Sequence, residues 1–333
     1  MKIRTFIDKA TLTNLVIRNS VATGVLEQLA YFFKCQASIY SDINKSEFQK
    51  IISLGRNGMG EMSKGQIELV KWLREYEPEH TTLENANCTV FLIDKEDKEC
   101  EHLQQQNKAF YFNLNLLLSN AFLLFSYFNI WSVKPNTNIP PYNFTSWSNL
   151  ELYHKYPHNA MVIIDDYILS SSFKNSRNYG IENNLFEMLD SLIPKGIDFQ
   201  LSIITKEIPT NTTKKEVFDF VQNKYPNLTL GIYFWNNKGC HDRNIITNSI
   251  WLHSGNSFCN YLYHYQGRGI AVNEMLQPTQ LMMFPLSYQH NTINQKKRHS
   301  VLESVKQMLY FVKTKIANNE SVLIGNPNNP LLQ

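Results

Sequence analysis

The distribution of apolar residues in the second half of the chain predicts alternating strands and helices. Continuous apolar runs at 160–164, 198–205 and 228–234 are typical of strands that are buried on both faces of a sheet. Between them, residues 184–193 and 214–225 have apolar positions at helical spacing. This order of elements predicts a mostly parallel sheet with flanking helices, in which ligands bind beyond the carboxyl ends of the strands.

The residues that follow are expected to extend this sheet and then to cover it. Residues 242–247 and 250–253 have the pattern of a β-hairpin with its turn at 248–249. Residues 295–316 are predicted to form an amphipathic helix with a basic start. The tail at 317–333 ends in NPNNPLLQ and is expected to be poorly ordered.

The first half of the chain has the pattern of a helix-rich α/β region. Its expected elements are strands at 2–7 and 88–94, helices at 12–40, 46–54, 64–76 and 107–131, and an extended piece at 110–112 if the last helix starts late. A segment rich in Pro, Asn, Ser and Thr marks a boundary near 135–147. We therefore expect an N-terminal region of unknown role at 1–134, a linker at 135–150, an α/β domain at 151–316 and the tail.

Composition narrows the class of protein. Of the 333 residues, 43% are hydrophobic and 13% aromatic, as in folded, core-forming proteins. The formal net charge of +3 is only weak evidence for an acidic partner. Five cysteines without regular spacing predict reduced thiols and a cytoplasmic location. We expect no secretion signal, because the basic N-terminus lacks an apolar segment and a small-residue cleavage site. We expect no membrane span, because the apolar run at 116–131 is shorter than the roughly 20 residues that cross a bilayer.

One short pattern carries the candidate chemistry, His241-x-Arg243-x4-Asn248, with Gly255-Asn256-Ser257 downstream. A histidine and an arginine two residues apart point to the same face of a strand. Together with the amide of Asn248 and the small polar residues Asn256 and Ser257, they would place a cation, an imidazole and hydrogen-bond donors around one anion.

This pattern resembles the phospholipase D superfamily motif, His-x-Lys-x4-Asp followed by Gly-Ser-x-Asn. The resemblance is closer to the phospholipase D-like domain at the C-terminus of MIT-domain proteins, and it covers roughly residues 158–260. The matching residues are His241, Asp242, Arg243, Ile245, Asn248, Trp251 and Gly255, with an upstream strand that ends in Asp165-Asp166-Tyr167. The resemblance implies a phospholipase D-like fold in which His241 attacks phosphorus and Arg243 holds phosphate oxygens. Asp165, Tyr167, Asp242, Trp251 and Gly255 would support this site. Members of the closer branch are regarded as binding modules.

Two substitutions bear on catalysis. Arginine at 243 keeps the positive charge of the family's lysine and improves bidentate contact with phosphate. Asparagine at 248 removes the carboxylate, and an imidazole without its carboxylate is a weaker nucleophile and base. The catalytic superfamily site also uses two copies of the motif, whereas this chain has one, and the segment around His154 and Lys155 lacks the downstream residues. A homodimer could supply the second copy.

Other interpretations stay open. The hairpin could be purely structural, with His241 and Arg243 paired to Asp165 and packed on Trp251. The set of Cys240, His241, His253 and Cys259 could bind zinc, although no Cys-x-x-Cys pair is present. The carboxylates of Asp8, Asp94, Glu96 and Asp97 could hold a divalent metal as in nucleases, or could simply begin a helix. The glycine-rich residues 55–60 could cradle phosphate, but they lack a preceding strand.

Basic and aromatic residues are spread over the second half of the chain and could hold and stack a nucleic acid, or could be ordinary solvated surface. They are Lys174, Arg177, Lys214, Lys215, Arg268, Lys296, Lys297, Arg298, Tyr261, Tyr263 and Tyr265.

The function we expect is recognition of a phosphate-containing ligand, nucleic acid in the first place, by a cytoplasmic bacterial protein without a cofactor or metal. Domains of this kind fused to an unfamiliar N-terminal region are common in phage defence, which makes that role an association and not a mechanism. One alternative is a metal-independent nuclease or phosphodiesterase that acts as a homodimer. Another is an adaptor that binds a protein partner.

Overall fold

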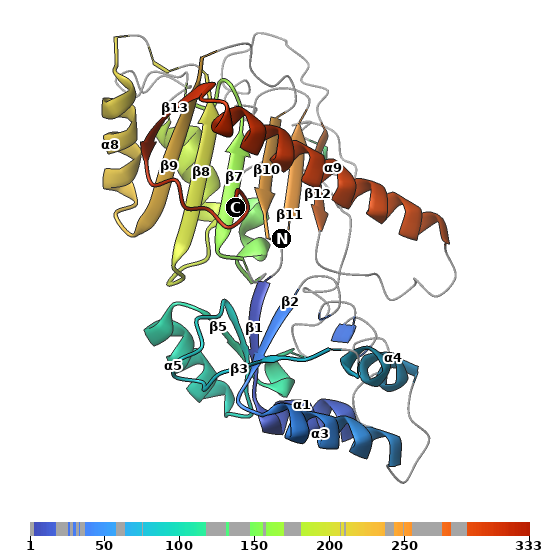
Figure 1. Cartoon of the computed structure of the whole chain (residues 1–333). Coiled ribbons are helices and arrows are strands. Elements are labelled where there is room, and N and C mark those ends of the chain that lie inside the picture. The colour runs from blue at the N-terminus through green and yellow to red at the C-terminus, as the bar shows by residue number, and fades with distance from the viewer. Residues whose placement is uncertain are drawn as a thin grey trace. The chain divides into compact units, whose positions relative to one another are not determined.

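The chain forms two compact units in a computed structural model (Figure 1). The structure describes residues 3–17, 26, 29–30, 33, 37–57, 64–74, 76–117, 131–132, 147–155, 158–169, 181–206, 208–209, 211–236, 243–248, 250–254, 275–280 and 292–333. The described residues up to 117 belong to the N-terminal unit, and those from 131 onward belong to the C-terminal unit. Both units are mixed α/β structures, each with its own sheet.

The N-terminal unit contains a five-stranded sheet in the order β3-β2-β1-β4-β5. Its strands are β1 (Ile3–Ile7), β2 (Ala37–Ser41), β3 (Glu79–His80), β4 (Val90–Leu92) and β5 (Phe110–Phe112). Every pairing is parallel. The sheet grows from β1 in two directions, so the carboxyl ends of β1 and β4 lie at a topological switch point, where such sheets bind ligands.

Helices connect the parallel strands, as the geometry of parallel pairing requires. They are α1 (Lys9–Ile17), α3 (Lys45–Asn57), α4 (Lys64–Leu73) and α5 (Asp97–Asn107). The first three pack against one another. α5 covers the other face through the buried Cys100, which joins a cluster with Phe6, Phe91 and Tyr111. The rings of Phe91 and Tyr111 are stacked with their centres 4.5 Å apart.

The N-terminal unit contains less helix than its sequence pattern predicts. The expected helix at 12–40 is wrong at its end, because residues 37–41 form β2. Residues 110–112 form a strand, in agreement with the alternative in which the helix expected at 107–131 starts after an extended piece. Most of the residues expected in that helix lie outside the described residues. The helices at 46–54 and 64–76 and the strand within 88–94 are confirmed.

The C-terminal unit contains an eight-stranded sheet in the order β13-β9-β8-β7-β10-β11-β12-β6. Its strands are β6 (Trp131–Ser132), β7 (Ala160–Ile164), β8 (Phe199–Thr205), β9 (Leu228–Trp235), β10 (Arg243–Thr247), β11 (Ile250–Ser254), β12 (Met275–Gln280) and β13 (Ser321–Gly325). The predicted strands and the hairpin of β10 and β11 are confirmed.

The expectation of a mostly parallel sheet in this unit is wrong. Among the described strands of this unit, only β7, β8 and β9 pair in parallel. β10 and β11 are antiparallel because a short turn joins them, and β10 also pairs antiparallel with β7. The mostly parallel sheet belongs instead to the N-terminal unit.

Helices cover both faces of the eight-stranded sheet (Figure 1). They are η1 (Trp147–Lys155), η2 (Glu182–Phe186), α7 (Glu187–Leu192), α8 (Lys214–Lys224) and α9 (Thr292–Ala317). α9 lies across one face, where its buried residues Val305, Leu309 and Val312 belong to one core cluster with Val162 and Ile246 of the sheet. η1 and α7 pack together.

The expectation of a poorly ordered tail is also wrong. Residues 321–325 form β13, which pairs antiparallel with β9 at the edge of the sheet. Beyond it, the buried Asn329 donates from Nδ2 to the main-chain oxygen of Met161 at 2.9 Å and to Oγ of Ser202 at 3.1 Å. Leu331 is buried in the same cluster as α9. The last segment is therefore an integral part of the unit.

Candidate functional site

The carboxyl end of β7 is a fixed turn. Asp165, which follows the strand, is completely buried. Its Oδ1 accepts a hydrogen bond from the main-chain nitrogen of Tyr167 at 2.8 Å. Its own main-chain nitrogen donates to the oxygen of Ile204 in β8 at 3.1 Å. These contacts tie the turn to the neighbouring strand and hold the Tyr167 side chain at the rim of the sheet.

Arg243 begins β10 at the same rim. β10 and β7 are paired so that Asn244 lies opposite Ile164, and the same register continued by one residue places Arg243 opposite Asp165. The guanidinium carbon of Arg243 lies 5.6 Å from the centre of the Tyr167 ring, and Tyr167 as a residue is 39% exposed. The structure therefore brings three of the predicted site residues together, one from β10 and two from the end of β7.

β8 contributes polar groups next to them. Oγ1 of Thr205, the last residue of β8, donates to the main-chain oxygen of Asp166 at 3.2 Å. The main-chain nitrogen of Lys206 donates to the same oxygen at 3.3 Å, and the Lys206 side chain is exposed. The carboxyl ends of β7 and β8 and the start of β10 thus form one polar rim, where ligands of α/β sheets bind.

Asn248 does not join this rim. Its Oδ1 accepts hydrogen bonds from the main-chain nitrogens of Asn159 and Ala160, each at 3.0 Å, at the amino end of β7. Asn248 follows Arg243 by five residues of extended chain, which span roughly 16 Å. The expectation that Asn248 and Arg243 act in one catalytic or phosphate-binding site is not met, because the five intervening steps along β10 place them at opposite ends of the strands.

Trp251 lies on the other face. It pairs with Ile246, which is buried under α9, and its Nε1 donates to Oδ1 of Asn244 at 2.8 Å. Successive side chains of a strand alternate between faces, so Arg243 points away from Asn244 and Trp251. Trp251 stabilises the hairpin, and the interpretation in which Arg243 packs on it is wrong.

The remaining residues of the motif lie outside the described residues. They are His241, Asp242, Gly255, Asn256 and Ser257, together with Cys240 and Cys259 of the zinc alternative. Within the ranges that the structure describes, no group of three or more His, Cys, Asp or Glu side chains is placed to hold a metal ion.

The acidic residues of the N-terminal unit act as local anchors. Asp8, at the carboxyl end of β1, accepts from the main-chain nitrogen of Thr11 at 2.7 Å and from that of Asp94 at 2.8 Å. It thus caps α1 and bridges the switch point. Asp97 accepts from Nδ2 of Asn113 at 2.6 Å.

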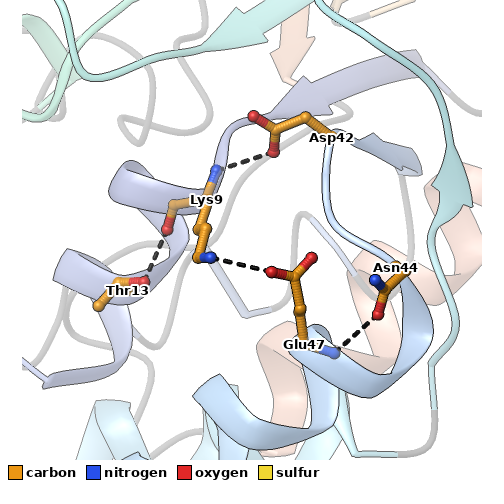
Figure 2. Close-up of polar contacts among 5 residues, drawn as sticks. All are labelled: Lys9, Thr13, Asp42, Asn44 and Glu47. Carbon is orange, nitrogen blue, oxygen red and sulfur yellow. Dashed lines mark hydrogen bonds and ion pairs between the residues drawn. The ribbon is translucent and has the colours of Figure 1, made fainter.

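Figure 2 shows the neighbouring end of β2. Asp42 accepts from the main-chain nitrogen of Lys9 at 3.0 Å, and Nζ of Lys9 lies 3.0 Å from Glu47. Asn44 caps α3 through the main-chain nitrogen of Glu47. Burial, and then the nearby charge of Asp8, raises the pKa of Asp42 above its ordinary value. Asp42 was not among the predicted site residues, because the helix expected at 12–40 includes most of β2 and so conceals that this aspartate directly follows a strand.

Several other candidates have ordinary structural positions. Residues 55–57 lie inside α3, which argues against a phosphate loop there, and residues 58–60 lie outside the described residues. Lys215 forms an ion pair with Asp219 one turn along α8. Residues 296–298 lie on α9, with side chains that are not described. The candidates at Lys174, Arg177, Tyr261, Tyr263, Tyr265 and Arg268 also lie outside the described residues.

His154 gives a prediction for the dependence of stability on pH. It lies half-buried in η1, and its Nε2 is buried without a hydrogen-bond partner in the described part of the chain. Burial lowers the pKa of His154 below its ordinary value of 6.5. The unfolded chain takes up this proton below pH 6.5 and the folded chain resists it. The stability contribution is therefore complete above this pH and is lost as the pH falls through it.

We expect the melting temperature to fall between neutral pH and about pH 5, and to fall less in His154→Gln. Differential scanning calorimetry across this range measures the difference. The exposed His80→Gln should follow the wild type. Parallel curves for wild type and His154→Gln would show that His154 is not the group responsible.

Comparisons with known proteins do not assign a family. No protein-family model and no curated protein matches the chain. A solved structure of TrmBL2, described as an archaeal chromatin protein with a novel mode of DNA binding, is 10% identical. The match covers 77% of this chain and 80% of that one, with a TM-score of 0.23, which does not establish a shared fold. In the parts of the chain with a described structure, no helix is long and apolar enough to span a membrane.

Proposed function

We propose that the C-terminal unit is a phospholipase D-like module that binds a phosphate-containing ligand, nucleic acid in the first place, at the rim formed by β7, β8 and β10. The observation that supports this best is the placement of Arg243 against Tyr167 at the carboxyl end of β7. The resemblance around residues 158–260 assigns phosphate binding to the position of Arg243.

The chemistry of these side chains suits a phosphate group. A guanidinium offers two parallel donors to phosphate oxygens, and stacking on an aromatic ring holds its plane in place. Buried Asp165 fixes the turn that carries Tyr167. His241 stands two residues before Arg243 in the sequence, which would turn its imidazole to the same face of an extended chain.

Two observations favour binding over hydrolysis. Position 248 carries an amide in place of the carboxylate that orients the catalytic histidine in the superfamily. That amide is also committed to the main chain at the amino end of β7. Hydrolysis by a homodimer that pairs two copies of the motif is the competing proposal, and an adaptor for a protein partner is the third.

Replacing Arg243 with glutamine is expected to weaken the binding of fluorescently labelled DNA or RNA by ten- to a hundredfold, which corresponds to the roughly 1.5–3 kcal/mol of a charge-assisted hydrogen bond. Fluorescence anisotropy in EDTA, repeated at increasing salt, measures this effect. Arg243→Lys should keep part of the affinity and of the salt dependence, since it keeps the charge but loses the bidentate contact. Arg74→Gln, at an exposed position of the N-terminal unit, serves as the matched control.

The same assay separates the alternatives. Cleavage in EDTA that is lost in His241→Ala would establish the nuclease. Cleavage that requires Mg²⁺ and survives this substitution would point to the carboxylates of the N-terminal unit. Equal binding by wild type and Arg243→Gln would overturn the proposal. If the protein binds no nucleic acid at all, the adaptor for a protein partner would be the remaining proposal.

The proposal extends to phage defence in a bacterial host, as an association with proteins of similar organisation. Plaque counts on a phage-sensitive strain that expresses the wild type or Arg243→Gln test this part. Equal plaque counts with and without the wild-type protein would contradict a role in phage defence.

A further inference from the structure

The rim of the C-terminal sheet presents an exposed aromatic ring beside a cation. Tyr167 is 39% exposed, although the turn that carries it is tied to Asp165 and β8. An exposed ring with a guanidinium at 5.6 Å offers a flat surface next to a phosphate site. Such a surface stacks on a base only when that base is unpaired, because the faces of paired bases are covered by their neighbours in a duplex.

Two lysines continue the positive charge along the same rim. Lys206 follows β8 directly and is exposed. Lys214 lies near the end of β9, with Nζ 5.3 Å from the centre of the Phe234 ring. The strand order β9-β8-β7-β10 arranges Lys214, Lys206 and Arg243 in sequence over three strand spacings, or roughly 14 Å. This row is long enough for several phosphates of one strand.

The acidic residues of α8 near this row have partners within the unit. Glu216 accepts from the main chain and hydroxyl of Thr213, and Asp219 pairs with Lys215. Glu216 also occupies the amino end of α8, which therefore offers no phosphate site of its own. Asp165 is buried beneath the rim. Within the described residues, neither Lys206 nor Lys214 forms an ion pair with a carboxylate.

From this arrangement we infer that the ligand is an unpaired nucleic acid strand that runs along the rim across β10, β7, β8 and β9. One phosphate lies on Arg243, the adjacent base stacks on Tyr167, and Lys206 and Lys214 hold the phosphates that follow. This inference rests on the proposed function, since it specifies the ligand of the same site.

The test compares a fluorescently labelled single-stranded oligonucleotide with the same sequence annealed to its complement. We expect the single strand to bind at least tenfold more tightly. Tyr167→Leu should weaken its binding roughly tenfold, because stacking on one aromatic ring is lost, whereas Tyr167→Phe keeps the ring and should bind like the wild type. Thermal melting of each variant shows that the unit remains folded.

The salt dependence tests the row of lysines. Three phosphate contacts on a single strand give a slope of about −2 in a plot of log affinity against log salt concentration, and Lys206→Gln with Lys214→Gln should reduce it to about −0.7. Lys224→Gln, at the opposite end of α8 from Lys214, should leave the slope unchanged.

The outcomes distinguish the two proposals. If Arg243→Gln weakens binding but the duplex binds as well as the single strand, or Tyr167→Leu binds like the wild type, the inference of an unpaired strand is overturned and the phosphate site stands. An unchanged slope in the double lysine variant also overturns the inference. If Arg243→Gln has no effect, the proposed function itself fails.

Discussion

Replacing Gly231 with alanine is expected to lower the free energy of unfolding of the C-terminal unit by about 3 kcal/mol, at the upper end of the cost of overpacking a core. Gly231 in β9 pairs with Gly325 in β13. A Cβ atom at position 231 would lie 2.2 Å from the main-chain oxygen of Asn326, a separation that no rotamer change relieves. The segment after β13 must therefore move away from the sheet. Thermal unfolding should show a melting temperature lower by roughly 6–12 °C.

Gly196 provides a control with a different kind of cost. It has a positive φ of 72°, but an added Cβ would meet no atom within 4 Å. Gly196→Ala should cost about 1 kcal/mol, from backbone conformation alone. Equal losses at the two glycines would mean that the close approach between β9 and Asn326 does not limit stability.

Replacing Asn329 with alanine is expected to cost about 3 kcal/mol as well, because it leaves buried hydrogen-bonding groups without partners. The side chain is fully buried and donates to Met161 and Ser202, while its Oδ1 accepts from the main-chain nitrogen of Leu331. Chemical denaturation should show a lower midpoint concentration of denaturant. The slope of the free energy of unfolding against denaturant concentration should change little, since the folded state keeps its buried surface.

Asn328 is the matched control for this substitution. It is exposed one residue earlier in the same segment, so Asn328→Ala should change the free energy of unfolding by less than about 0.5 kcal/mol. If Asn329→Ala were as mild, the segment after β13 would be a surface attachment and not part of the core.

The strands at the centre of the C-terminal sheet could be predicted because burial on both faces selects continuous apolar residues. Residues 160–164 are all buried in β7, and the predicted and observed limits agree. The edge strands carry a weaker signal. β13 has the short sequence SVLIG, with partly exposed side chains, and its Asn- and Pro-rich surroundings are typical of loops.

In the N-terminal unit, short strands concealed the parallel sheet. β2 is buried at alternate positions and follows a long apolar stretch whose spacing in the sequence is helical, so the start of the strand leaves no clear mark in the sequence. β3 has only two residues. The order of strands depends on contacts between distant segments, which periodicity alone does not report.

The candidate site was predictable only where its residues adjoin strands with a clear sequence pattern. Asp165 ends a clear strand, and Arg243 begins a clear hairpin, so both could be placed near the edge of a sheet. The motif spacing did not reveal that Asn248 lies at the opposite end of the strands from Arg243. A motif gives only the distance along the chain, whereas the end of the sheet at which a residue lies depends on strand length and pairing. Lys214 lies at the rim because α8 packs on β9, and the sequence pattern does not report this contact.

The position of Asn329 also sets the order of events when the protein is synthesised. Its bond to Met161 spans 168 residues of sequence, and β9 keeps an open edge until residues 321–325 have been made. The C-terminal unit therefore completes its fold only after nearly all of its chain has left the ribosome, and such long-range closure is slow. Nascent chains that stop before β13 would leave main-chain N–H and C=O groups at this edge of β9 unpaired and would need protection from aggregation.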